Sequence, residues 1–208
     1  MTTVGRWSPN KVRARVLDGT WVSPEELGGM VLLTPSSVDI TGGGSETATT
    51  LANGSVEFTA CGTVSLNGVF SADYDNYMVS IRQDSSSATS YYYRLRDSGS
   101  DNSTANSYVS QYLYADNTTV AAARVTTDKG LLGYLGSVLR NGLTLNIYGP
   151  YLAQPSAWRT VWVDDLSNAR TYDVAGTHNQ STAYDGFTLI PTAGTITGLV
   201  SVFGLVGA

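Results

Sequence analysis

The sequence predicts an all-β protein, in particular a jelly-roll-type antiparallel β-sandwich with an N-terminal docking arm. Short segments rich in Val, Thr, Tyr and Trp recur along the 208 residues, and Gly, Ser, Asn or Asp residues separate them. Strands spaced by about 8–12 residues in this way are typical of sandwiches and barrels. Charged residues form only 14% of the chain, whereas surface helices normally carry many Glu, Lys and Arg residues.

The arm comprises residues 1–28, and a β-hairpin is its expected structure. Residues 11–16 alternate basic and aliphatic side chains, Asp18 and Gly19 form a turn signal, and residues 20–22 return as a second strand. A two-stranded hairpin is marginal by itself, so we expect the arm to dock on another chain. The expected docking residues are Trp7, Arg13, Arg15 and Trp21.

Residues 29–208 form the second expected unit, a single β-sandwich domain. One stretch, residues 128–141, has Leu and Val at spacings that would also suit a helix. Its three internal glycines would each cost a helix about 1 kcal/mol, which favours a loop with a strand or a broken turn. The expected strands are 30–33, 38–41, 55–58, 64–66, 77–82, 91–96, 108–114, 118–124, 142–148, 158–163, 169–174, 186–190 and 196–206.

Charge and composition argue against several classes of function. The formal net charge is -5, with 12 Lys and Arg against 17 Asp and Glu, whereas nucleic-acid binding needs clustered cations. No run of about twenty apolar residues is present, so we expect no membrane insertion. The single cysteine, Cys61, cannot form a disulfide within the chain, and its small, apolar neighbours predict a buried core position.

Catalytic motifs are weak in this sequence. His178 is the only histidine, and no Gly-x-Ser-x-Gly elbow accompanies it. Three pairs of acids could in principle hydrolyse a glycoside, but turns are the ordinary place for Asp. We therefore expect no catalytic residue, no cofactor and no metal, and keep a hydrolase as the alternative. The pairs are Asp73 with Asp75, Asp97 with Asp101, and Asp164 with Asp165.

Two strands are apolar on both faces, which predicts burial against a second layer or a neighbouring subunit. In residues 158–163, Trp158 and Trp162 alternate with Val161 and Val163. Residues 198–206 show a similar pattern. We expect a homotrimer or a comparable closed oligomer, and its expected interface residues are Trp158, Trp162, Val202 and Phe203.

Two polar loops, residues 83–90 and 97–107, are the expected contact surface, because loops on a rigid scaffold vary without loss to the core. Aromatic rings beside small hydrogen-bonding groups suit a glycan. The expected contact residues are Tyr108, Tyr112, Asp97, Asp101 and Asn102.

Several short segments carry a family resemblance. They are MVLLTPSS (30–37), VSLNGVF (64–70), YDNY (74–77), RLRDSGSD (94–101), AYDGFTL (183–189) and GLVSVFGL (198–205), with RARVLDGTWV (13–22) as a lead-in. Together they resemble the β-rich domains that end many minor tail or tail-fibre-like proteins of tailed bacteriophages, especially phages of actinobacteria. The resemblance implies a virion surface protein, a homotrimer, and no catalytic residues to carry over.

The expected function is therefore structural and adhesive, that of a minor tail or fibre protein that presents loops to the host. A capsid decoration or head-fibre protein is the alternative within this class, and a tailspike-type polysaccharide hydrolase is the alternative outside it. A third class, a stand-alone carbohydrate-binding module, would need exposed aromatic residues that are not buried between subunits. The expected partners are other copies of the chain, virion proteins reached through the arm, and a host surface glycan. The expected location is the phage particle, after synthesis in the bacterial cytoplasm without a signal peptide.

Overall fold

A computed structural model describes residues 29–116, 118–137, 140–164 and 170–206. The expected docking arm, with Trp7, Arg13, Arg15 and Trp21, lies outside the described residues. The described residues form sixteen strands and no helix. These strands are β1 (Gly29–Leu33), β2 (Ser37–Thr41), β3 (Thr47–Thr50), β4 (Val56–Cys61), β5 (Thr63–Asn67), β6 (Asn76–Ser85), β7 (Thr89–Asp97), β8 (Ser100–Asp101), β9 (Tyr108–Asp116), β10 (Thr119–Thr127), β11 (Gly130–Leu135), β12 (Arg140–Tyr148), β13 (Ser156–Asp164), β14 (Thr171–His178), β15 (Gly186–Pro191) and β16 (Ile196–Val206).

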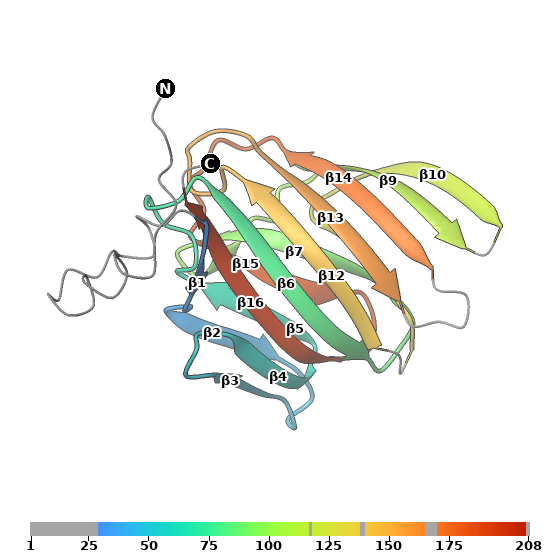
Figure 1. Ribbon diagram of the computed structural model, residues 1–208, viewed down its shortest axis with the longest axis horizontal. Coiled ribbons are helices and arrows are strands. Elements are labelled where there is room, and N and C mark those ends of the chain that lie inside the picture. Colours follow the sequence, from blue (N-terminus) through green and yellow to red (C-terminus); the bar gives the residue numbers. More distant parts are fainter. Residues whose placement is uncertain (1–28, 117, 138–139, 165–169, 207–208) are drawn as a thin grey trace, which may run out of the picture.

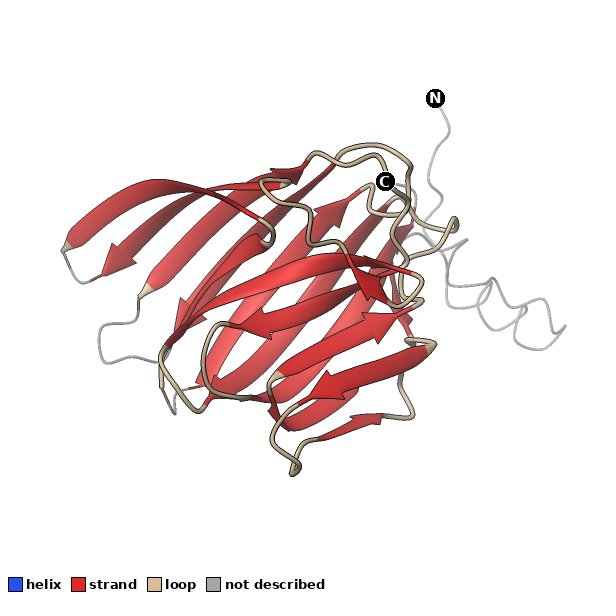
Figure 2. Ribbon diagram, turned by 180° about the vertical axis from the view of Figure 1, so that it is seen from behind, coloured by secondary structure: helices blue, strands red, loops and turns tan. Residues whose placement is uncertain are grey.

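The strands form two stacked antiparallel sheets, which confirms the expected all-β sandwich (Figures 1 and 2). The large sheet has ten strands in the order β10-β9-β14-β13-β12-β6-β16-β4-β3, and β1 also pairs with β16. The small sheet has six strands in the order β11-β7-β15-β5-β2, and β8 also pairs with β7. Because the sheets differ in width, one end of the large sheet, β9 and β10, extends beyond the small sheet (Figure 1).

The core lies between the two sheets and follows the alternation of side chains along each strand. On β6, Tyr77, Val79 and Ile81 are buried, and the residues between them point away from the small sheet. On β7, the inward residues are Tyr91 and Tyr93 with Leu95. The same period of two is what the sequence predicted for these strands.

Residues 130–135 of the ambiguous stretch form strand β11, in agreement with the expected loop-and-strand structure. The glycine at its start has a packing reason. A Cβ atom on Gly130 would lie 2.3 Å from Cε1 of Tyr93 and 3.0 Å from Cζ2 of Trp158. A bulge between Leu131 and Gly133 then bends the strand over the large sheet.

The expected subunit interface is wrong for three of its four residues. Trp158 and Trp162 are 1% and 0% exposed, and Val202 is 1% exposed, all within the chain's own core. The second layer that covers them is the small sheet of the same chain. Phe203 points to the outer face of the large sheet. On the outer face of β13, Val161 and Val163 remain 49% and 52% exposed.

Candidate functional site

Three half-buried tyrosines lie side by side on the inner face of the large sheet, beyond the edge of the small sheet. Tyr112 and Tyr114 come from β9, and Tyr172 comes from β14, directly opposite Tyr114. Tyr172 is also paired with the core residue Trp162 of β13, which fixes the face on which all of these rings lie. We call Tyr112, Tyr114 and Tyr172 the tyrosine shelf.

The last strand of the small sheet on this side is β11, and it does not extend over the shelf. Side chains of the large sheet form hydrogen bonds with the backbone of β11 at Leu131. Leu131 N–H donates to Ser110 Oγ at 3.1 Å, and Trp158 Nε1–H donates to the Leu131 carbonyl at 3.2 Å. Because Ser110 is two residues before Tyr112 on the same face of β9, cover by the small sheet ends between these two positions.

The shelf rings hold one another in place. The ring centroids of Tyr114 and Tyr172 are 5.3 Å apart, and the two planes are nearly parallel, at 20°. Tyr112 lies 6.3 Å from each of them. Trp162 supports Tyr172 from below with an edge contact at 4.9 Å. Such mutual packing fixes the rings while leaving one side of each partly exposed.

The surroundings of the shelf provide both charge and flat surface. Arg170 and Asp116 form an ion pair at one end, with 2.6 Å between Nη2 and Oδ2. On the β10 side, the inner-face residues opposite the tyrosines are small, namely Ala121 opposite Tyr114 and Ala123 opposite Tyr112. The tyrosine shelf is therefore flanked by two alanines on the β10 side and by the hydrogen-bonding groups of Arg170 and Asp116 at one end.

The expected contact residue Tyr112 belongs to the shelf, but the structure contradicts the same role for Tyr108. Tyr108 is 0% exposed. Its ring stacks on His178 at 4.1 Å, and its hydroxyl accepts a hydrogen bond from Leu95 N–H at 2.9 Å. Both tyrosines point to the same face of β9. The two tyrosines differ in burial because the small sheet covers Tyr108 and does not extend as far as Tyr112.

The other three expected contact residues lie near the β7–β8 hairpin, away from the shelf. Asp97 is exposed, and β7 turns into β8 through Ser98 and Gly99, whose φ angles are 51° and 80°. Asp101 accepts a hydrogen bond from Arg96 Nη1 at 2.6 Å. Asn102 Nδ2 donates to the Tyr184 hydroxyl at 2.7 Å. Asp101 and Asn102 therefore already have partners within the chain.

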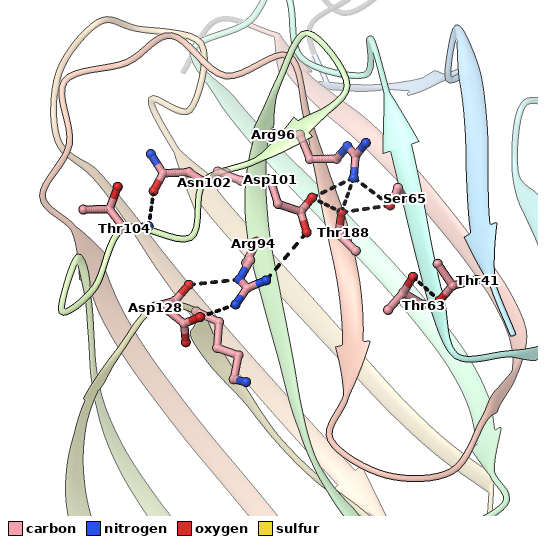
Figure 3. Close-up of polar contacts among 12 residues, drawn as sticks. Thr41, Thr63, Ser65, Arg94, Arg96, Asp101, Asn102, Thr104, Asp128 and Thr188 are labelled. Carbon is pink, nitrogen blue, oxygen red and sulfur yellow. Dashed lines mark hydrogen bonds and ion pairs between the residues drawn. The ribbon is translucent and has the colours of Figure 1, made fainter.

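Arg96 organises the polar outer face of the small sheet (Figure 3). Its side chain is nearly buried and donates to Ser65, Asn67 and Thr188 at 2.8–2.9 Å. Asp101 supplies the ion pair. With this many partners, the guanidinium of Arg96 joins β5, β7, β8 and β15, which is a structural role.

Arg94 lies next to this network and ends in a second ion pair, with Asp128 (Figure 3). Its Nε also donates to the Asp128 carbonyl at 3.1 Å. The pair links β7 to the turn that enters β11. Arg94 and Arg96, which lie two residues apart on the outer face of β7, are thus both paired with nearby acids.

The only histidine has no catalytic setting. His178 is fully buried, and its Nε2 lies 2.8 Å from the Tyr184 hydroxyl. Burial lowers the pKa of His178 from 6.5 to about 4, and a hydrogen bond with the Ser107 backbone opposes this only in part. The imidazole is therefore neutral at pH 7 and serves as a packing partner for Tyr108 and Tyr184.

The remaining candidate groups also have structural settings. Asp73 and Asp75 are exposed in the turn before β6, where Ser71 Oγ donates to Asp73 at 3.0 Å. Asp164 ends β13, and Asp165 lies outside the described residues. Burial raises the pKa of the Cys61 thiol, which keeps it protonated. Among the described residues, no group of three or more His, Cys, Asp or Glu could hold a metal ion.

Within the described part of the chain, no helix is long and apolar enough to cross a membrane.

Comparisons with known proteins give no family for this chain. No protein-family model and no curated protein matches it. Among solved structures, it is similar to the C-terminal CBM6 of LamC, a marine laminarinase from Zobellia galactanivorans, with a TM-score of 0.29 and 12% identity over 83% of this chain and 98% of that one. It is also similar to the botulinum neurotoxin serotype G binding domain, with a TM-score of 0.25 and 10% identity over 86% of this chain and 44% of that one. At these levels of similarity no ligand or activity can be transferred.

Sequence reasoning found Tyr112 and missed Tyr114 and Tyr172. The signal that could have found Tyr114 is its spacing, since Tyr112 and Tyr114 fall on one face of a strand whose hairpin partner offers only Ala121 and Ala123. Because alanine side chains are too small to bury the large rings opposite them, this pattern indicates that the rings are partly exposed to solvent. Tyr172 depends on the pairing of β14 with β9, which is distant in sequence.

Proposed function

We propose that this chain is a non-catalytic binding protein that attaches to a glycan through the tyrosine shelf. In the wider setting implied by the sequence resemblance, it acts as a structural and adhesive virion component of a tailed phage, such as a minor tail or fibre protein. The observation that carries the glycan proposal is the shelf itself, in which Tyr112, Tyr114 and Tyr172 are partly exposed and their rings pack on one another.

The chemistry of the shelf supports a sugar ligand. Aromatic rings present apolar faces that pack on the C–H face of a sugar ring, and their hydroxyls supply hydrogen bonds at the rim. Tyrosine loses little side-chain entropy on binding, because it has only two χ angles. Arg170 and Asp116 at one end of the shelf add polar groups for sugar hydroxyls.

The two alternative functions are a capsid decoration protein and a polysaccharide hydrolase. A capsid decoration protein would need the same β-sandwich scaffold, and the sequence resemblance to virion proteins does not distinguish a position on the tail from one on the capsid. A polysaccharide hydrolase would need two carboxyls across a binding surface. Asp73 and Asp75 instead lie in a turn, and Asp101 is held in an ion pair with Arg96.

The test is binding of the purified chain to bacterial cell-wall and capsular polysaccharides, measured by pull-down and then by calorimetry. Tyr112→Ala and Tyr114→Ala should each weaken binding about fivefold, since a stacking aromatic contact contributes roughly 1 kcal/mol. Tyr148→Ala is the matched control, because Tyr148 is 44% exposed on the outer face, away from the shelf. Equal binding by all three variants would contradict the proposal, and so would release of sugar fragments by the wild-type chain.

A further inference from the structure

Strand β10 is the outermost strand of the large sheet, and among the described strands it pairs with β9 alone (Figure 1). Its nine residues, TVAAARVTT, pair without interruption from Thr119 opposite Asp116 to Thr127 opposite Tyr108. The strand has no proline, no glycine and no lysine, and Arg124 is its only charged residue. Its free edge therefore offers a long, regular row of backbone N–H and C=O groups.

The other sheet edges of the same molecule are protected in ways that natural edges usually are. The opposite edge of the large sheet is divided between β1 and β3, which have five and four residues. Edge strand β2 carries the exposed Asp39. Edge strand β11 has a bulge, and Ser110 and Trp158 bind its backbone groups. Strand β10 is longer than β1 and β3, has no bulge, and carries one exposed charge, Arg124, on its outer face.

The two faces beside the β10 edge are apolar as well. On the outer face, Val120 is 76% exposed and Leu113 of β9 is 55% exposed. On the inner face, Ala121 and Ala123 lie beyond the cover of the small sheet. An exposed edge with apolar residues on both sides is a surface that favours another strand.

We propose that β10 pairs antiparallel with β10 of a second copy of this chain, about a two-fold axis at Ala123. The residues of β10 fit their own copy in this register. Ala123 faces itself, Ala121 faces Val125 of the second copy, and Ala122 faces Arg124 of the second copy. No like charges stand opposite each other, and the residues nearest the axis are small enough for close approach.

This pairing differs from the trimer interface that the sequence predicted through Trp158 and Trp162, both of which are buried within one chain. It also has a geometric consequence. A two-fold axis perpendicular to the sheet keeps the inner faces on one side, so the two tyrosine shelves face the same way. Tyr112 and Tyr112 of the second copy are then three strand spacings apart, about 14 Å, with the Ala123 pair between them.

The experiment is sedimentation equilibrium of the purified chain over a range of concentrations, with two opposite substitutions at one exposed position. Ala122→Lys places a second cation opposite Arg124 of the second copy, twice per dimer, and should raise the dimer dissociation constant roughly 3- to 30-fold. Ala122→Glu places an anion there and should lower that constant. Thr177→Lys, on the outer face of β14, is the charge-matched control and should leave the constant unchanged.

Thermal unfolding of each variant checks that the β-sandwich is intact, and the Glu variant keeps the test decisive if the Lys variant is unstable. A wild-type dimer that responds in opposite directions to Ala122→Lys and Ala122→Glu supports the proposal. A wild-type chain that stays monomeric at the highest attainable concentration overturns it. A trimer, or a dimer that is indifferent to both substitutions, also overturns it.

Discussion

His178 should make the stability of this protein fall as the pH is lowered from neutral toward 4. Its pKa is about 4 in the folded chain because burial disfavours the charged ring, and 6.5 is the ordinary value expected after unfolding. Between these two pH values the unfolded state binds more protons than the folded state, so the stability contributed by the neutral ring is complete above about 6.5 and is lost as the pH falls.

The magnitude follows from the two pKa values. The interval from 6.5 to about 4, at roughly 1.4 kcal/mol per pH unit, corresponds to at most about 3.5 kcal/mol. The groups that face the ring, Tyr108 and Tyr184, stay neutral throughout this range, because burial raises the pKa of both hydroxyls. They cannot compensate the charge that the ring would gain.

The assay is urea unfolding of the wild type and of His178→Gln at pH 7 and at about pH 4.5. Gln can keep a hydrogen bond to Tyr184 and does not titrate. Carboxylates such as Asp173, whose pKa is lowered by its hydrogen bond with Arg159, change both proteins alike. The wild type should lose roughly 2–3 kcal/mol more than the variant between the two pH values. Equal losses in both proteins would refute this account of the buried ring.

Two further pairs of substitutions test the core packing and the hydrogen bonding of Arg96. In thermal unfolding, Gly176→Ala should destabilise the protein by about 1–3 kcal/mol, because the new Cβ would lie 2.2 Å from Cζ2 of Trp158. Gly142→Ala is the control and should be tolerated, because no atom lies within 4 Å of its Cβ. Arg96→Lys should cost roughly 2–4 kcal/mol, since an ammonium group cannot reach the several acceptors that the buried guanidinium serves, while Arg140→Lys at an exposed ion pair should change stability by less than about 0.5 kcal/mol. A comparable loss for both members of either pair would contradict the corresponding reasoning.

The strands of this fold could be predicted from sequence because each carries its own pattern. The period of two separates Trp158 and Trp162 from Val161 and Val163, and the structure places these two sets on opposite faces of β13. The pattern does not say which layer covers which face. For this reason the sequence alone predicts a subunit interface for the tryptophans, although the small sheet of the same chain covers them.

At the candidate site, too, the local sequence predicts which face of a strand a residue occupies, but not whether a segment distant in sequence covers it. Tyr108 and Tyr112 are indistinguishable by their positions on β9, and only the reach of β11 across the sheet makes one a core residue and the other a surface residue. The loop 97–107 likewise looks like a free polar connection in sequence. In the structure Asp101 is fixed by Arg96 of β7.

The measurement that tests the central claim most directly is NMR chemical-shift mapping of the isotope-labelled chain, titrated with a fragment of the polysaccharide that it retains in pull-down. The shelf as binding surface predicts that the largest shift changes cluster at Tyr112, Tyr114 and Tyr172, with smaller ones at Arg170. Changes that cluster instead on residues 97–107, with the shelf signals unmoved, would contradict the account and return the binding surface to the polar loop.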